Sequence, residues 1–284
     1  MRITIGVLPD FSVNFDNLGK TMNSNILQRN LPSNMSQAVS GYNWRQNHIG
    51  FSETMVFHLE AKNKKPLYLK IDPRSSKFSL LQEKLRLDWL KNKLPVPEVL
   101  MFAEDENNEY LLLSEISGVP AIDDSLKNNI PHIIEQLVNG LKMIHQLPIE
   151  KCPFDTQLDD KIEVARERMM KGLVEEEDFD DERQGRTAED VFEELIATEP
   201  PDEDLVFTHG DYCVPNVILE NGKLSGFVDW AEAGIADRFQ DIALLSRSVW
   251  NNFGRKYEES VFEIYGIEPD WKKIHFYRLL DEFF

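Results

Sequence analysis

The segment THGDYCVPNVILENGKLSGFVDW, residues 208–230, is the most informative part of this 284-residue chain. Asp211 precedes Asn216 by five positions, and Asp229 follows thirteen positions later, at the end of a β-rich run. Between them, Asn221-Gly222 is a strong hairpin turn signal. A single Asp or Asn in such a segment is more often a turn residue or a helix cap, because both favour local hydrogen bonds. The joint spacing of the three side chains is what points to chemistry.

This Asp-Asn-Asp spacing is that of the catalytic loop and metal-binding aspartate of protein kinases. Phosphoryl transfer needs a carboxylate that aligns the attacking hydroxyl and accepts its proton, and oxygen ligands that hold Mg²⁺ on the nucleotide phosphates. Magnesium takes a few hard oxygen ligands from protein and keeps several waters, which suits an Asn and an Asp. The spacing therefore predicts Asp211 as the catalytic base and Asn216 and Asp229 as the metal ligands.

A lysine and a glutamate ahead of this segment fit the same chemistry. Lys70 lies in the β-rich run LYLKI, and Glu83 lies thirteen residues later in a helical pattern. In kinases such a Lys binds the α- and β-phosphates, and such a Glu holds the Lys in place. Each residue alone is commonplace as a surface charge. The prediction therefore rests on their order ahead of the Asp-Asn-Asp set.

Other nucleotide-binding features of the first third are weaker. Gly50 and Ser52 lie in a tight turn before a strand, where backbone amides can approach phosphate. A plain β-turn is the commoner explanation of such a segment. Tyr68 and the strand backbone at Ser114 and Ile116 are candidates to face an adenine, although apolar strands of this kind are usually core.

The chain is predicted to be an α+β protein of two lobes joined near residue 116. Residues 56–61 and 66–72 form an expected antiparallel hairpin, a helical pattern then ends at Pro95, and 110–116 is an expected buried strand. Long helical patterns dominate the remainder. We expect a loosely attached extension over residues 1–25, a nucleotide-binding lobe over 26–116, and a catalytic and substrate-binding lobe over 117–284.

The charge of the chain is strongly negative. Its 31 Lys and Arg against 50 Asp and Glu give a net charge of -19. Such a surface repels phosphate, which disfavours nucleic acid or an anionic membrane as a partner and favours a cationic one. Residues 155–204 alone hold 20 Asp or Glu and 6 Lys or Arg. A solvated helix face is the ordinary explanation of an acidic run, and a wall that binds a polycation is the alternative.

Cysteine usage and hydropathy indicate the compartment. Cys152 and Cys213 cannot form a disulfide framework, which is typical of a reducing cytosol. The N-terminal run lacks the apolar core of a signal peptide, and no stretch approaches the roughly 20 apolar residues of a membrane span. We expect a soluble, cytoplasmic protein.

In the extent and order of its motifs, the chain resembles the aminoglycoside 3'-phosphotransferases, the kanamycin and neomycin kinases, from about Gly41 to Phe284. The pieces that carry the resemblance are GYNWRQNHIG, LYLKID, QEKLRLDWL, KLPVPEVL, CPFD, GLVEEEDFDDERQG, VFTHGDYCVPNV, SGFVDW, GIADRFQDIALLSR and FYRLLDEFF. The resemblance implies a two-lobed protein-kinase-like fold, with a small N-terminal lobe of antiparallel sheet plus helix and a larger, mainly helical C-terminal lobe. It also implies ATP or GTP and Mg²⁺ as cofactors and an aminoglycoside as substrate.

The resemblance also implies roles for individual residues, and it repeats those given above for Asp211, Asn216 and Asp229. On the nucleotide side it implies Lys70 with its partner Glu83, Ser52 over the β-phosphate, Tyr68 stacked on the base, and Ser114 and Ile116 at the edge of the base. The implied aminoglycoside-binding residues are Asp178, Asp180, Asp181, Arg247, Asp281, Glu282 and Phe284 with its terminal carboxylate. Single exposed ion pairs contribute only about 0 to 1 kcal/mol, so many such pairs must act together.

The chain departs from the family pattern at two positions. Shortly after the metal aspartate, familiar members carry Arg in DCGR or DLGR, whereas this chain reads DWAE with Glu232. After Ser246 and Arg247, they place an acidic residue that contacts substrate amines, whereas this chain has Asn251. Both positions bear on substrate range and regiospecificity rather than on phosphoryl transfer.

The resulting hypothesis is ATP- or GTP-dependent phosphorylation of the 3'-hydroxyl of kanamycin-like aminoglycosides, which confers resistance. One alternative is a kinase of the same fold for another hydroxylated small molecule, a macrolide or a metabolite, because a fold alone does not choose a substrate. Another alternative is a non-catalytic protein that binds nucleotide or polycations. We expect a monomer or a homodimer.

Overall fold

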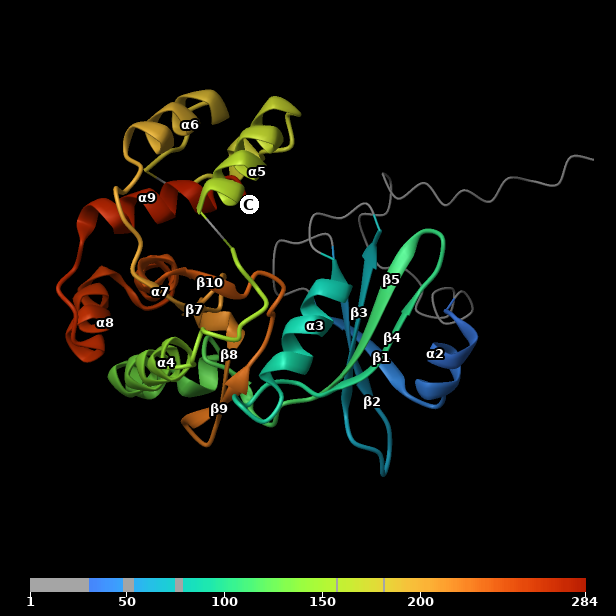
Figure 1. The fold of residues 1–284 in the computed structure, drawn as a ribbon. Coiled ribbons are helices and arrows are strands. Elements are labelled where there is room, and N and C mark those ends of the chain that lie inside the picture. Colours follow the sequence, from blue (N-terminus) through green and yellow to red (C-terminus); the bar gives the residue numbers. More distant parts are fainter. Residues whose placement is uncertain (1–30, 48–53, 75–78, 157, 181) are drawn as a thin grey trace, which may run out of the picture.

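The computed structural model describes residues 31–47, 54–74, 79–156, 158–180 and 182–284. A sheet-rich part comes first in the chain, and a mainly helical part follows it (Figure 1). None of the described helices combines the length and the apolar character of a membrane span. The expected extension over residues 1–25 lies outside the described residues, as do Gly50, Ser52 and Asp181.

Within the described residues, the sheet-rich part is built on five antiparallel strands in the order β1-β2-β3-β5-β4. The strands are β1 (Asn43–Asn47), β2 (Met55–Glu60), β3 (Leu67–Pro73), β4 (Val99–Glu104) and β5 (Asn108–Ser114). The predicted hairpin is confirmed, because β2 pairs with β3. The predicted buried strand is also confirmed as β5, which lies between β3 and β4. A division of the chain at residue 116 stays a prediction.

Apolar side chains cover both faces of this sheet, because successive residues of a strand point to opposite faces. In β5, Leu111 and Leu113 belong to the large core that α3 (Leu80–Leu90) shares with the helical part. Tyr110 and Leu112 belong to a second core on the other face. There they pack near Met35 and Val39, which lie in and just after α2 (Ser33–Ala38), and Figure 1 shows α2 beside the sheet.

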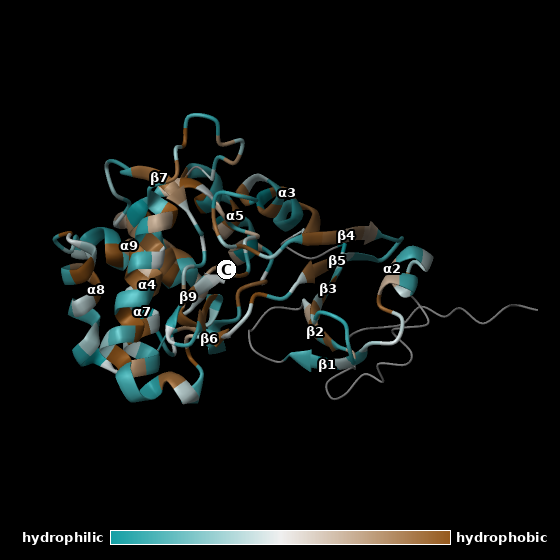
Figure 2. Cartoon of the chain, turned by 90° about the horizontal axis from the view of Figure 1, so that it is seen from below, coloured by the Kyte–Doolittle hydropathy of each residue, from teal (hydrophilic) through white to brown (hydrophobic). Residues whose placement is uncertain are grey.

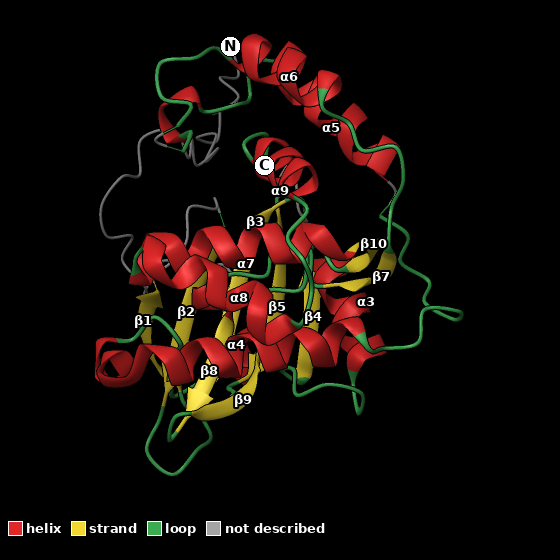
Figure 3. Cartoon of the chain, turned by 90° about the vertical axis from the view of Figure 1, so that its left-hand side faces the viewer, coloured by secondary structure: helices red, strands yellow, loops and turns green. Residues whose placement is uncertain are grey.

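Six longer helices make up the second part, as far as the structure describes it. They are α4 (Ile130–His145), α5 (Leu158–Met170), α6 (Ala188–Ala197), α7 (Arg238–Phe253), α8 (Glu258–Tyr265) and α9 (Trp271–Asp281). Short 3-10 turns cover Asp124–Asn129, Glu176–Asp178, Val214–Asn216 and Arg255–Tyr257. Each helix carries both hydrophobic and hydrophilic residues along its length, as expected of amphipathic helices that share one core (Figure 2). α7 packs on α8 and α9, and α6 packs on α5 and α9 (Figure 3).

Short strands of the second part position Asp211, Asn216 and Asp229, the predicted catalytic base and metal ligands. They are β6 (Val119–Pro120), β7 (Leu205–Thr208), β8 (Val217–Glu220), β9 (Lys223–Phe227) and β10 (Gly234–Asp237). The predicted hairpin is confirmed as β8 and β9, and both of its turn residues, Asn221 and Gly222, have positive φ angles of 51° and 75°. Asp211 follows β7, Asn216 immediately precedes β8, and Asp229 follows β9.

Candidate active site

The loop between β7 and β8 holds Asp211 and Asn216 together. The Asn216 amide nitrogen donates to Oδ2 of Asp211 at 2.9 Å and to the Asp211 backbone carbonyl at 3.0 Å. The 3-10 turn Val214–Asn216 brings the two residues into contact across five positions. Because the amide nitrogen serves Asp211, the amide oxygen Oδ1 of Asn216 is left as a hard oxygen donor.

Two hydrogen bonds tie this loop to the residue that precedes Asp229. The Val228 N–H donates to the Asn216 carbonyl at 3.0 Å, and the ring of His209 donates from Nε2 to the Val228 carbonyl at 3.0 Å. Asp229 itself has a φ of 68°, in the left-handed region that is uncommon for residues other than glycine. Backbone strain of this kind persists only where the surroundings impose it, and it is concentrated at functional sites.

Lys70 lies between two carboxylates. Its Nζ is 2.8 Å from both carboxylate oxygens of Glu83, which α3 supplies, and 3.1 Å from Oδ1 of Asp229. Burial lowers the pKa of Lys70, but the charges of Asp229 and Glu83 outweigh this effect and hold the pKa above its ordinary value. In turn, the charge of Lys70 keeps the pKa of Asp229 below its ordinary value. The ammonium group is therefore charged and fixed beside Asp229.

A buried carboxylate on α7 anchors the start of the loop between β7 and β8. Asp241 is fully buried, and its two oxygens accept the N–H groups of His209 at 2.7 Å and of Gly210 at 2.9 Å. His145 of α4 donates to the same carboxylate at 3.1 Å. Burial raises the pKa of Asp241, but the hydrogen bond and charge of His145 and the charge of His209 hold it below its ordinary value. The backbone directly before Asp211 therefore rests on an ionised carboxylate.

Asp211 lies in a strongly anionic environment. Burial and the negative charges of Asp281, Asp229 and Glu232 together raise the pKa of Asp211 to about 7, against the hydrogen bond from Asn216. These three acids come from α9, from the end of β9 and from the segment before β10. Two of them, Asp281 and Glu232, line one pocket together with Gly210, the residue before Asp211.

The raised pKa of Asp211 predicts a pH-dependent stability. In the unfolded chain this carboxyl ionises near 3.8, whereas in the folded protein it ionises near 7. The folded state therefore binds more protons in this window, and ionisation of Asp211 lowers the free energy of unfolding as the pH rises from about 4 to about 7. We expect Asp211→Asn, which cannot ionise, to gain more stability over the wild type at pH 8 than at pH 5. Urea unfolding without metal or nucleotide measures this, and an equal gain at both pH values would contradict it.

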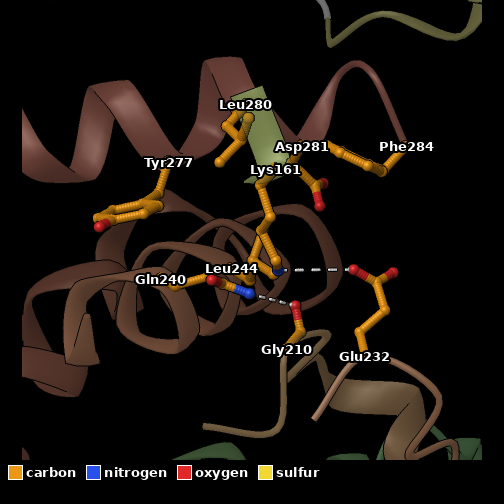
Figure 4. A pocket seen from close by; sticks show the side chains of 9 residues that line it. All are labelled: Lys161, Gly210, Glu232, Gln240, Leu244, Tyr277, Leu280, Asp281 and Phe284. Atoms are coloured by element: carbon orange, nitrogen blue, oxygen red, sulfur yellow. Dashed lines mark hydrogen bonds and ion pairs between the residues drawn. The ribbon is translucent and has the colours of Figure 1, made fainter. Parts of the chain in front are cut away.

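A pocket lies directly beside Asp211 (Figure 4). Its lining includes Gly210, the neighbour of Asp211, together with Glu232, Asp281 and Phe284. Lys161, on α5, reaches into the pocket and points toward Glu232. Two of the predicted substrate-binding residues, Asp281 and Phe284, thus lie next to the predicted base.

The predicted substrate-binding acids near the end of α9 are paired with arginines. Arg247 contacts Asp180 at 3.0 Å and also contacts Asp281. Arg183 is almost completely buried and lies 2.9 Å from Glu282 and 3.4 Å from Asp180. Burial and the charge of Asp180 raise the pKa of Glu282 to about 7, although Arg183 opposes this. The arginines therefore hold the acids in place and neutralise part of their charge.

Asp178, Tyr68, Ser114 and Ile116 are not among the residues that line the pocket beside Asp211. Asp178 is exposed on the 3-10 turn Glu176–Asp178. On the nucleotide side, Tyr68 stands opposite Leu113 in the sheet, and its ring lies 4.9 Å from that of His58. The N–H of Ser114 is bonded to the Glu98 carbonyl at 2.9 Å. The Ile116 side chain lies against Gly226 of β9.

Sequence reasoning missed three residues of this region: Asp241, Arg183 and Lys161. Asp241 gave one signal, because it is a lone acid just before the apolar run IALL. Arg183 is a base within the acidic run DDERQG, and such a base is a candidate counter-ion. Lys161 gave no signal that distinguishes it from a surface lysine.

The comparisons with known sequences agree with the predicted family. The family model for the phosphotransferase enzyme family matches residues 43–277. An aminoglycoside 3'-phosphotransferase of Niallia circulans is 36% identical over 258 residues, covering 90% of this chain and 98% of the relative. One of Escherichia coli is 35% identical over 261 residues, covering 89% of this chain and 95% of the relative.

Solved structures agree with the predicted fold. An aminoglycoside-3'-phosphotransferase of type VIII has a TM-score of 0.80 at 30% identity, covering 92% of this chain and 97% of that one. An aminoglycoside phosphotransferase from Streptomyces rimosus has a TM-score of 0.75 at 26% identity, covering 88% of this chain and 95% of that one. The predicted two-lobed α+β fold is thereby confirmed. The chain is a phosphotransferase that belongs to the phosphotransferase enzyme family, in which the aminoglycoside 3'-phosphotransferases are its relatives.

Proposed function

We propose that this protein transfers the γ-phosphoryl group of ATP or GTP to the 3'-hydroxyl of kanamycin-like aminoglycosides and so confers resistance to them. The observation that carries the proposal is the convergence of Lys70, Asp229 and Asp211. Lys70 bonds to Asp229, Val228 next to Asp229 donates to the Asn216 carbonyl, and the Asn216 amide donates to Asp211. Gly210, the neighbour of Asp211, lines the acidic pocket. The relatives named aminoglycoside 3'-phosphotransferases support both the reaction and the acceptor.

Lys70 is the proposed contact to the nucleotide phosphates. Its ammonium is charged and anchored by Glu83, and phosphate oxygens would compete with Asp229 for it. The Streptomyces rimosus phosphotransferase was solved in complex with ADP and streptomycin, which supports a nucleotide donor. In this assignment Glu83 is a positioning residue, since it acts through Lys70.

Magnesium is the proposed metal because the donor set fits it. The amide oxygen of Asn216 and the carboxylate of Asp229 are hard oxygen ligands, and two such ligands leave room for waters and phosphate oxygens. A bound Mg²⁺ supplies charge neutralisation on the transferring phosphoryl group. The bonds through Val228 hold the Asn216 and Asp229 backbones in register for this role.

Asp211 is the proposed catalytic base. Its carboxylate orients the 3'-hydroxyl and accepts the hydroxyl proton while the new P–O bond forms and the P–O bond to the leaving nucleoside diphosphate breaks. A base whose pKa lies near the working pH both accepts and releases a proton readily. The pKa of about 7 suits this task.

The acids around the pocket are the proposed contacts for the substrate's ammonium groups. An aminoglycoside carries several such groups at neutral pH, and a site lined by carboxylates raises the local concentration of a polycation. Glu232 and Asp281 line the pocket, and both raise the pKa of Asp211 through their charges. Binding of the aminoglycoside should weaken as the salt concentration rises, because the carboxylates are partly exposed and salt screens exposed charges.

A coupled assay of ADP release over an antibiotic panel tests the proposal. We expect release with kanamycin A and none above background with a macrolide. 3'-Deoxykanamycin A is the matched control, because it keeps the ammonium groups of kanamycin A but lacks the 3'-hydroxyl, and it should give no release. Release with a macrolide alone would favour the other-substrate kinase, and kanamycin binding without any release would favour the non-catalytic alternative.

A further inference from the structure

An ion pair crosses the pocket beside Asp211. Nζ of Lys161, on α5, lies 3.7 Å from Oε2 of Glu232, and the two side chains are only 16% and 22% exposed. Figure 4 shows the lysine reaching down into the pocket and the carboxylate rising toward it from the opposite side. Among the described residues that line the pocket, Lys161 is the one that carries a positive charge, whereas Glu232 and Asp281 are acidic.

Glu232 is held firmly in this position. Its backbone carbonyl packs so closely on Gly210 that a Cβ there would lie 2.4 Å from the carbonyl oxygen, which excludes any larger residue at 210. The next carbonyl, that of Ala233, accepts a hydrogen bond from Arg86 of α3 at 2.5 Å. The backbone is thus clamped on both sides, and the carboxylate faces the pocket next to Asp211.

Lys161 is held less firmly than its partner. It projects from a helix on a flexible four-carbon chain, and in the structure its one ion-pair partner among the described residues is Glu232, at a distance too long for a strong hydrogen bond. Its ammonium group is chemically equivalent to those of an aminoglycoside. A substrate ammonium and the Lys161 ammonium cannot occupy the same position on the Glu232 carboxylate.

We infer that Lys161 and Glu232 form a substrate-specificity element, in which Lys161 holds the place of one substrate ammonium group and leaves it when the substrate binds. This inference rests on the proposed function, since it names a subsite for the same substrate. Glu232 is then the binding residue for an ammonium that lies close to the phosphorylated hydroxyl. Lys161 is a competitor built into the chain, which weakens binding of every ligand that must displace it to place an ammonium on Glu232.

Binding of kanamycin A to four proteins tests the inference by isothermal titration calorimetry. Removing the competitor in Lys161→Met is expected to lower the Kd about three- to tenfold, the scale of one partly buried ion pair. Glu232→Gln is expected to raise the Kd by a similar factor. The double variant is expected to have a Kd within twofold of that of Glu232→Gln alone, because the lysine has lost the carboxylate that it pairs with.

Lys171→Met is the matched control. It removes the same charge just beyond the end of α5, where Lys171 pairs with Glu167 on the surface at 2.7 Å, and the Kd should stay within about twofold of the wild type. An unchanged or raised Kd in Lys161→Met, or a full gain that persists without Glu232, would overturn the inference.

The two claims fail in different measurements. If the wild type binds kanamycin A with a Kd that Lys161→Met lowers, yet releases no ADP, the proposed function is refuted and the subsite is supported. A wild type that phosphorylates kanamycin A while its Kd is indifferent to Lys161→Met refutes the subsite alone.

Discussion

Asp211→Asn is expected to lower kcat for kanamycin A phosphorylation by about 10³-fold, the middle of the range for loss of a general base. The substitution keeps the shape of the side chain and an oxygen that can accept the hydrogen bond from Asn216. It removes the proton acceptor and one negative charge. Because the loop is also held through Asp241, the fold should remain intact.

The kinetic effect should fall on kcat rather than on the KM for nucleotide, because Asp211 is not a proposed contact to ATP. Asp124→Asn is the matched control, since Asp124 has an almost fully exposed side chain and takes the same substitution. The control should keep wild-type rates in the ADP-release assay. Wild-type kcat in Asp211→Asn would remove Asp211 from the mechanism.

Asp241→Ala is expected to lower the free energy of unfolding by about 3–5 kcal/mol, the scale of breaking a buried charged network. The truncation leaves the N–H groups of His209 and Gly210 buried without their acceptor and takes the carboxylate partner from His145. An unsatisfied buried donor costs about 1–3 kcal/mol by itself.

The same truncation should also lower kcat, because the backbone before Asp211 loses its anchor. Urea unfolding and the ADP-release assay measure the two effects on one preparation. Asp241→Asn keeps one acceptor oxygen at unchanged volume, so its loss of stability should be smaller than that of Asp241→Ala. Equal stability of Asp241→Ala and the wild type would show that the carboxylate does not hold the loop.

The parts of the site that the sequence predicts share short, patterned spacings. Lys70 and Glu83 lie on a strand and on the helix that follows it, and the structure places them 2.8 Å apart. The hairpin at Asn221-Gly222 follows from the left-handed conformation that these two residues tolerate. Local preferences of this kind act within one or two elements, so a single sequence reveals them.

The parts that the sequence does not reveal depend on partners far along the chain. Arg183 meets Glu282 across 99 positions, and no local pattern announces such a pair. By sequence alone, the acidic run 155–204 indicates a solvated helix face or a wall that binds a polycation, whereas Asp180 of this run is paired with Arg183 and Arg247. Near the end of the chain, Asp281 and Glu282 are paired with the same two arginines. Whether an acid is free or paired is decided by tertiary packing, which composition does not record.

The position of the phosphate on kanamycin A tests the account most directly. The purified protein is incubated with kanamycin A and MgATP, and the product is analysed by phosphorus and proton NMR. We predict one phosphomonoester, on the 3' oxygen, recognised by coupling between the phosphorus and the 3' proton. A phosphate on any other hydroxyl, or unmodified kanamycin A after incubation with stoichiometric enzyme, would contradict the account.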